Sequence, residues 1–229
     1  NFYECIIGGA AFNKEVEDFL HQIRFPYTVG YGMTECGPII GYEDKHIFAK
    51  GSCGKPAPRM EVKIDSADPQ NQPGEILAKG TNVMLGYYKN EEETLQAIDE
   101  EGWLHTGDLG TIDKQGNIFI RGRKKTMLLG ANGQNVYPEE IEDVIATHTI
   151  FEESVVVQRG EKLVALVYIS APALEHHGLT RDTLMQELDT YKRHINSYLP
   201  AFANIAAIEV QEQEFEKTPK RSIRRYLYT

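Results

Sequence analysis

The segment that decides the fold class is FYECIIGGAAFNKEVEDFLHQIRFPYTVGYGMTE, residues 2–35. Residues 2–7 predict a short strand, Pro26 ends the next element, and residues 27–31 predict a second strand. Between the strands, apolar residues recur at the spacing of one helix face, and Asn13 is a candidate cap. These apolar residues are Phe12, Val16, Phe19, Leu20 and Ile23. A strand–helix–strand unit is typical of a parallel α/β sheet.

Downstream of this unit the pattern of apolar residues, glycines and prolines changes twice. Residues 51–123 contain short alternating apolar runs punctuated by Gly and Pro, which predict a small antiparallel β unit, with a barrel as one form it could take. From residue 124 onward the order is helix, two strands, a long helix that Thr180 can cap, and a last strand. This order predicts a compact α+β domain. We therefore expect an α/β and α+β chain with a domain boundary between residues 123 and 124.

The composition restricts the class of protein. The chain has 229 residues, with 24 basic and 34 acidic side chains and a net charge of −10. This negative charge disfavours binding to nucleic acid or anionic lipid. Its 3 cysteines form no even disulfide set and no CxxC metal pair, and no apolar run approaches the roughly 18 residues of a spanning helix. We expect a cytoplasmic protein without a transmembrane segment. The start inside an apparent strand, without Met, suggests a piece of a longer chain.

Four stretches carry residues suited to chemistry, but each also has an ordinary structural interpretation. Thr34 and Glu35 can hold a phosphate oxygen and its Mg²⁺, or can begin a helix. Asp108 can accept hydrogen bonds from a ribose diol, or can cap a turn. The cations of residues 121–125 are equally typical of a solvated linker. The glycine loop at 130–142 runs into a helix and by itself predicts only a turn.

In order and combination these stretches resemble the adenylate-forming superfamily, which includes acyl-CoA synthetases, peptide-synthetase adenylation domains and luciferases. Seven segments appear in the family order, and they span nearly the whole chain. They are residues 8–10, 31–35, 51–56, 74–76 with 86–88, 106–109, 122–123 and 133–142. The sequence of residues 132–142 is most similar to AMP-forming acyl-CoA synthetases, the long-chain fatty-acid group especially. The resemblance therefore implies that residues 1–123 are the end of the large domain and residues 124–229 the small mobile domain.

The resemblance implies roles for single residues. Those assigned to the nucleotide are Gly8, Gly9, Ala10, Tyr31, Gly32, Thr34, Asp108 and Arg123. Within this set, Tyr31 would stack on adenine, Thr34 would contact phosphate, and Asp108 and Arg123 would hold the ribose hydroxyls. Glu35 would bind Mg²⁺.

Two further positions would serve the conformational change. Lys125 occupies the family's hinge position, and Gly133 would lie on the loop that shapes the coenzyme A channel. The implied reaction has two halves. A carboxylate, expected to be a fatty acid, attacks ATP to give acyl-AMP, and the thiol of coenzyme A then displaces AMP. Catalysis of this kind depends on positioning and charge neutralisation. A homo-oligomer is compatible with the sequence.

Two departures from the family pattern create alternatives. Ser222 stands where the family has its tail lysine, so Lys220 or Arg221 would have to replace that cation from a shifted register. The five cations of the tail are otherwise typical of a solvated, partly mobile segment. The family's phosphate loop has no counterpart in this chain, so we expect little catalysis by the chain alone. The alternatives are a non-catalytic nucleotide- or acyl-adenylate-binding protein and an enzyme that loads a carrier-protein thiol.

Overall fold

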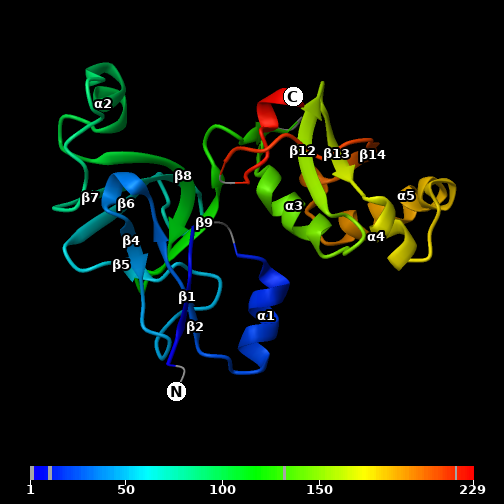
Figure 1. Ribbon diagram of the computed structural model, residues 1–229. Coiled ribbons are helices and arrows are strands. Elements are labelled where there is room, and N and C mark those ends of the chain that lie inside the picture. Colours follow the sequence, from blue (N-terminus) through cyan, green and yellow to red (C-terminus); the bar gives the residue numbers. More distant parts are fainter. Residues whose placement is uncertain (1–2, 10–11, 131–132, 220) are drawn as a thin grey trace. The chain divides into compact units, whose positions relative to one another are not determined.

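The computed structural model describes residues 3–9, 12–130, 133–219 and 221–229. The chain divides into two compact units, Asn1–Lys125 and Thr126–Thr229, so the observed boundary follows residue 125. Both units combine helices with mostly antiparallel sheets, which confirms the predicted fold class (Figure 1). Within the described ranges, no helix is long and apolar enough to cross a membrane.

The first unit opens with the predicted strand–helix–strand. Strands β1 (Cys5–Ile7) and β2 (Tyr27–Val29) pair in parallel on either side of α1 (Lys14–Gln22) in the sequence. The Asn13 side chain caps α1 by accepting hydrogen bonds from the first turn, as its residue type predicted. Glu17 is the buried residue of α1, and it accepts a hydrogen bond from the Tyr27 hydroxyl at 3.2 Å.

The rest of the first unit is antiparallel, as predicted. Its further elements are β3 (Tyr31–Gly32), η1 (Thr34–Cys36), β4 (Ile39–Tyr42), β5 (Lys55–Pro56), β6 (Met60–Asp65), β7 (Gly74–Gly80), α2 (Glu91–Ala97), β8 (Leu104–Ile112) and β9 (Ile118–Arg123). Strands β3–β5 form one sheet, and β6–β9 form a second in which each strand pairs with the next. Among the described residues, Ile118 of β9 also forms backbone hydrogen bonds with Cys53 and Gly54, just before β5, so the two sheets are joined at this edge and the barrel form stays a prediction. Buried Ile76, Leu104 and Ile118 belong to the core of the unit.

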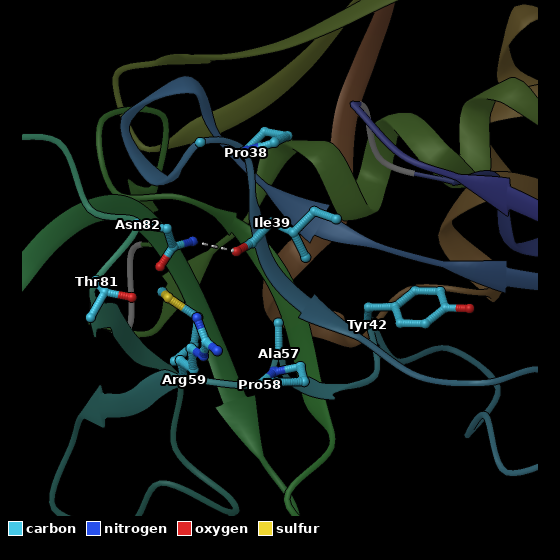
Figure 2. A pocket seen from close by; sticks show the side chains of 10 residues that line it. Pro38, Ile39, Tyr42, Ala57, Pro58, Arg59, Thr81 and Asn82 are labelled. Atoms are coloured by element: carbon cyan, nitrogen blue, oxygen red, sulfur yellow. Dashed lines mark hydrogen bonds between the residues drawn. The ribbon is translucent and has the colours of Figure 1, made fainter.

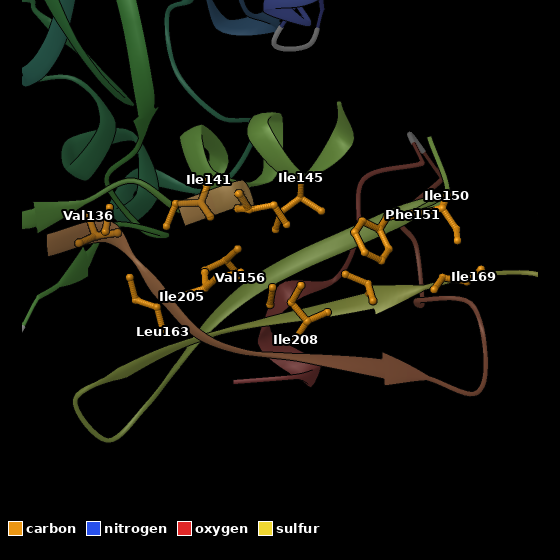
Figure 3. Close-up of a cluster of buried hydrophobic side chains, with 14 of the residues drawn as sticks. Val136, Ile141, Ile145, Ile150, Phe151, Val156, Leu163, Ile169, Ile205 and Ile208 are labelled. Atoms are coloured by element: carbon orange, nitrogen blue, oxygen red, sulfur yellow. The ribbon is translucent and has the colours of Figure 1, made fainter. Parts of the chain in front are cut away.

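The second unit is the predicted α+β domain. Its elements are β10 (Leu128–Leu129), β11 (Asn135–Val136), α3 (Pro138–Ala146), β12 (Glu153–Arg159), β13 (Lys162–Tyr168), α4 (Ala171–His176), α5 (Arg181–Ser197), η2 (Ala201–Ala203), β14 (Ile205–Gln211) and η3 (Arg225–Leu227). Strand β13 pairs antiparallel with β12 and parallel with β14. Figure 3 shows Ile141 and Ile145 of α3 facing the sheet, where Val156 and Ile205 belong to the same buried cluster.

The tail of the second unit is packed against its sheet. Phe215 is only 3% exposed and meets the Tyr228 ring edge-on at 4.9 Å. Lys217 pairs with Glu153, and Arg225 lies between α3 and β12. The interpretation of the tail as a solvated segment is therefore wrong for Lys217 and Arg225, whereas Arg221 and Ser222 are exposed.

Candidate functional site

Tyr31, Asp108 and Arg123 come together in the first unit from three different strands. The Tyr31 hydroxyl donates to Oδ2 of Asp108 at 2.7 Å, and the Arg123 Nε lies 2.7 Å from Oδ1 of the same carboxylate. Asp108 and Arg123 are cross-strand neighbours of β8 and β9. Burial, reinforced by the charge of Asp108, raises the pKa of Tyr31, so its hydroxyl stays protonated and donates. The result is an oriented carboxylate with a guanidinium beside it.

The segment around Asp108 is a bulged strand, and the interpretation of Asp108 as a turn-capping residue is therefore wrong. Gly107 has a φ of +71°, which favours glycine, and the β8–β9 register shifts just after Leu109. Thr106 accepts a hydrogen bond from the Asp108 amide at 3.1 Å and donates to the Ile76 carbonyl at 2.7 Å. Bulges re-aim side chains, and here the bulge sets the direction of the carboxylate.

Thr34 and Glu35 form one turn of 3-10 helix directly after β3. Thr34 is exposed, and Glu35 is half-buried with its carboxylate accepting a hydrogen bond from the Tyr87 hydroxyl at 2.9 Å. Burial, together with the hydrogen bond to Glu35, raises the pKa of Tyr87, so this hydroxyl also acts as a donor. The turn thus carries an exposed hydroxyl and a half-buried carboxylate on consecutive residues.

Gly32 has a steric reason to be glycine. A Cβ atom at this position would lie 1.9 Å from the carbonyl oxygen of Pro38. The Met33 amide donates to that same carbonyl at 2.8 Å, which holds the two ends of the loop together. Gly32 therefore shapes the loop that carries Thr34 and Glu35, a contribution that sequence reasoning did not identify.

The glycines after β1 lie at the same sheet edge as the residues that precede Tyr31. Gly8 follows β1 and Gly30 follows β2, and these parallel strands end together because the Gly30 amide donates to Ile7 at 2.8 Å. Gly8 is exposed, and Gly9 has a φ of +91°. Carboxyl ends of parallel strands are common ligand sites in α/β sheets. Ala10, the third residue of this predicted group, lies outside the described residues.

The remaining predicted positions are at the end of the first unit and in the second. Lys125 is the exposed last residue of the first unit. Gly133 is exposed, has a φ of +76° and closes the β10–β11 turn by donating to the Gly130 carbonyl at 2.8 Å. Ser222 is exposed in a turn closed by Thr218, and Lys220 lies outside the described residues.

A shallow pocket of about 340 Å³ adjoins the Thr34–Cys36 turn in the first unit. Pro38, Ile39, Arg59 and Asn82 contribute to its lining. Figure 2 shows the Asn82 amide directed at the Ile39 carbonyl, to which it donates at 3.1 Å. Sequence reasoning missed this contact, and it assigned no role to Glu75 within the family segment 74–76, because the contacts of both residues join positions far apart in the sequence.

Two family models match the chain. Residues 3–88 match the model described as AMP-binding enzyme, and residues 125–228 match the AMP-binding enzyme C-terminal domain. Among curated proteins, the chain is 37% identical over 199 residues to 4-coumarate–CoA ligase 5 of Oryza sativa subsp. japonica, covering 79% of this chain and 36% of that protein. It is 40% identical over 183 residues to the long-chain-fatty-acid–CoA ligase of Escherichia coli O6:H1, covering 75% and 32%. The chain thus spans about a third of the length of these relatives.

Solved structures agree with the sequence matches. The o-succinylbenzoate CoA synthetase of Bacillus subtilis in complex with its acyl-adenylate intermediate superposes with a TM-score of 0.81 and 25% identity, covering 99% of this chain and 46% of that one. The complex of the same enzyme with ATP and magnesium ion gives a TM-score of 0.78, with 97% and 45% covered. From these matches, and from the ordered motifs that preceded them, the chain belongs to the AMP-binding enzymes of the adenylate-forming superfamily.

Proposed function

We propose that this chain contributes the nucleotide site and the C-terminal domain of an AMP-forming carboxylate–CoA ligase. The observation that carries the proposal is the Asp108 carboxylate, held between the Tyr31 hydroxyl and the Arg123 guanidinium. A carboxylate accepts two hydrogen bonds with its paired oxygens, which suits a ribose diol. The Tyr31 ring is only 7% exposed and packs in the core of the unit, so we assign Tyr31 to orienting the Asp108 carboxylate through its hydroxyl. The named CoA ligases among the relatives and structural neighbours support the same reaction class.

The residues also fit a magnesium ion that arrives with the nucleotide. Mg²⁺ usually keeps several waters and binds one or two carboxylates together with substrate phosphates. Glu35 supplies one such carboxylate, and the exposed Thr34 hydroxyl is its neighbour. Among the residues that the structure describes, no cluster of three or more His, Cys, Asp or Glu side chains could hold an ion alone. We therefore assign Glu35 to a phosphate-bound Mg²⁺, which would neutralise charge on the ATP.

In the proposed cycle the second unit supplies a different surface to each half-reaction. The tail around residues 220–222 would serve adenylation, and the glycine loop at Gly133 would serve attack by coenzyme A. Lys125 would be the hinge, because it ends the first unit and is exposed. A hinge must change its backbone angles, and proline fixes φ. Lys125→Pro should therefore block one half-reaction and spare the other. Equal rates for the variant and the wild type in both halves would contradict the hinge assignment.

The acid is proposed to be a fatty acid. Support comes from the sequence of residues 132–142 and from the 40% identity to a long-chain-fatty-acid–CoA ligase. The experiment is acid-dependent ATP–pyrophosphate exchange by the full-length protein that carries this chain. Acetate, octanoate, palmitate, 4-coumarate and an amino-acid mixture form the separate arms. Exchange with octanoate or palmitate supports the proposal, whereas exchange with 4-coumarate alone replaces the fatty acid by an aromatic acid. A second step with coenzyme A or a carrier-protein thiol identifies the acceptor.

Ser222 favours one alternative function. A serine cannot supply the cation that the family's tail lysine brings to the reacting phosphate, and loss of such a contact costs on the order of 3 kcal/mol. In the second unit Ser222 lies exposed in a turn whose other members include Arg221. If folded full-length protein binds AMP but gives no exchange with any acid, nucleotide binding without catalysis becomes the better assignment. Comparing the adenylation rates of Lys220→Ala, Arg221→Ala and Ser222→Ala identifies the group that replaces the lysine.

A further inference from the structure

Glu75 is a buried carboxylate next to the Asp108–Arg123 pair, and the family segment 74–76 that contains it gave it no role. It lies on β7 and is only 6% exposed. One of its oxygens accepts a hydrogen bond from the Gly107 amide at 3.1 Å. The other accepts from the Lys124 ammonium at 2.8 Å and lies 3.1 Å from Nδ1 of His105.

These contacts close a ring around the bulge. The Gly107 carbonyl accepts a hydrogen bond from the Lys124 amide at 2.8 Å, while the Gly107 amide is bound by Glu75. The Lys124 side chain then returns to Glu75. The peptide groups of Gly107 are thus held from both sides by two residues that also hold each other.

The ring contains the residues that flank Asp108 and Arg123 in the sequence. Gly107 immediately precedes Asp108, and Lys124 immediately follows Arg123. Asp108 and Arg123 are themselves cross-strand partners. The ring therefore fixes the backbone of Gly107 and Lys124, the residues next to Asp108 and Arg123. The distance between the Asp108 carboxylate and the Arg123 guanidinium depends on this ring.

The charge of Glu75 is needed for this arrangement. Burial disfavours the charged form, but the hydrogen bonds and charges of Lys124 and His105 outweigh it and lower the pKa of Glu75. The Lys124 side chain is 58% exposed, so the ion pair by itself adds little to the free energy of folding. Its contribution is geometric, since it closes the ring over a strand bulge.

We propose that Glu75 and Lys124 are positioning residues that hold Asp108 and Arg123 at the spacing required to bind both hydroxyl groups of a ribose. This inference rests on the proposed function, because it presumes a nucleotide ribose as the ligand. Neither residue touches the ligand. Both act through the backbone of the neighbouring pair.

The test compares two ligands, AMP and its dideoxy analogue, which lacks both ribose hydroxyls. Their affinities are measured by equilibrium titration of the full-length protein that carries this chain, in its wild-type form and as the Glu75→Gln and Lys124→Met variants. Each substitution removes a charge-assisted hydrogen bond, so we expect AMP to bind about tenfold more weakly. Binding of the analogue should stay within about twofold of the wild type, since it does not use the pair. Lys124→Arg keeps a cation near Glu75 and should restore most of the AMP affinity.

Asp113→Asn is the matched control. Asp113 organises the opposite end of the β8–β9 hairpin by accepting hydrogen bonds from the Asn117 and Gln115 amides at 2.8 and 2.9 Å. The Asp113→Asn variant loses a carboxylate from the same hairpin but should still bind AMP more tightly than the dideoxy analogue. Because Glu75 and Lys124 belong to one ring, the variant with both substitutions should bind AMP no more weakly than either single variant.

The possible outcomes distinguish failure of the positioning role from failure of the proposed nucleotide site. Equal weakening of AMP and the analogue, or unchanged affinity for both, overturns the positioning role. A wild-type chain that binds AMP no better than the analogue overturns the ribose site itself, and the inference with it. If Glu75→Gln does not fold, Lys124→Met decides the matter, because the lysine side chain is largely exposed and its loss leaves no cavity.

Discussion

Arg225 should contribute more to the stability of the second unit than any other cation of the tail. Its guanidinium donates two hydrogen bonds to the Glu142 carboxylate, at 2.7 and 2.8 Å, and a third to the Val156 carbonyl at 2.7 Å. Glu142 also accepts from the Val156 amide at 2.6 Å. One ion pair therefore joins the tail, α3 and β12. The perturbation is Arg225→Ala.

The magnitude follows from burial. Both side chains of the pair are 18% exposed. Breaking a buried pair costs about 3–5 kcal/mol because the remaining charge is left without its partner, and the residual exposure places this one near the lower end, at about 3 kcal/mol. Burial already raises the pKa of Glu142 despite the hydrogen bonds from Arg225, so the lone carboxylate would be costly to keep charged at pH 7. With a urea slope of about 1.5 kcal/mol per M, the midpoint should fall by about 2 M.

The assay uses the distribution of chromophores. The chain has 1 tryptophan, Trp103, and it lies in the first unit, whereas the long helix α5 lies in the second. Arg225→Ala should lower the urea midpoint seen by far-UV circular dichroism and leave the tryptophan fluorescence transition in place. Arg224→Ala is the control, since Arg224 approaches Glu216 only to 3.7 Å at an exposed site. That control should change stability by less than about 0.5 kcal/mol. Similar shifts for the two variants would refute the reasoning.

Three further predictions test the electrostatics and sterics. Burial, with the charge of a nearby glutamate, raises the pKa of Asp143 from 3.8 to about 6. The folded state therefore binds this proton more tightly than the unfolded state, and the stabilisation from the bound proton is lost as pH rises from about 4 to 6. Asp143→Asn should therefore be more stable than the wild type by up to about 2 kcal/mol at pH 7 and equally stable below about pH 4. A stability difference that stays constant across pH would contradict the assignment. Tyr31→Phe removes the hydroxyl that donates to Oδ2 of the buried Asp108 carboxylate and should destabilise the first unit by about 1–2 kcal/mol. Urea unfolding followed by tryptophan fluorescence measures this loss, and an unchanged midpoint is the contrary result. Gly32→Ala places a Cβ 1.9 Å from a backbone oxygen and should cost about 3 kcal/mol or more. Gly133→Ala meets no atom of the described residues within 4 Å and should cost about 1–2 kcal/mol for its positive φ alone. Equal losses in thermal unfolding would show the steric account to be wrong.

Local signals in the sequence were sufficient for the elements that have them. Asn13 and Thr180 cap α1 and α5, and Pro138 begins α3, each through a preference that acts within one helical turn. The helices α2 and α4 were not predicted, although Asn90 and Ser170 cap them. Neither helix buries a residue, so neither leaves an apolar periodicity to detect.

The segment 103–108 shows where local reasoning failed. Its glycine and aspartate are typical of a turn, yet the structure keeps them inside β8. A turn prediction considers only neighbours in sequence. The strand is maintained by its pairing with β7 and β9, and Glu75 of β7 binds the Gly107 amide at the bulge where Gly107 has a positive φ. Only the fold brings that carboxylate to that amide.

The same argument separates two kinds of residue at the candidate site. Asp108 and Arg123 were predicted from the sequence because they lie in ordered motifs whose residues have side chains suited to binding a ligand. The contacts that orient them join residues far apart in the chain, 77 positions for Tyr31 with Asp108 and 49 for Glu75 with Lys124. No periodicity or spacing rule spans such separations. Burying an ionised carboxylate is costly unless it is paired and hydrogen-bonded, so a buried carboxylate with such partners, like Glu75, holds those partners in a defined geometry. Such carboxylates are therefore where positioning residues should be sought once a fold is known, and Glu75 meets that description.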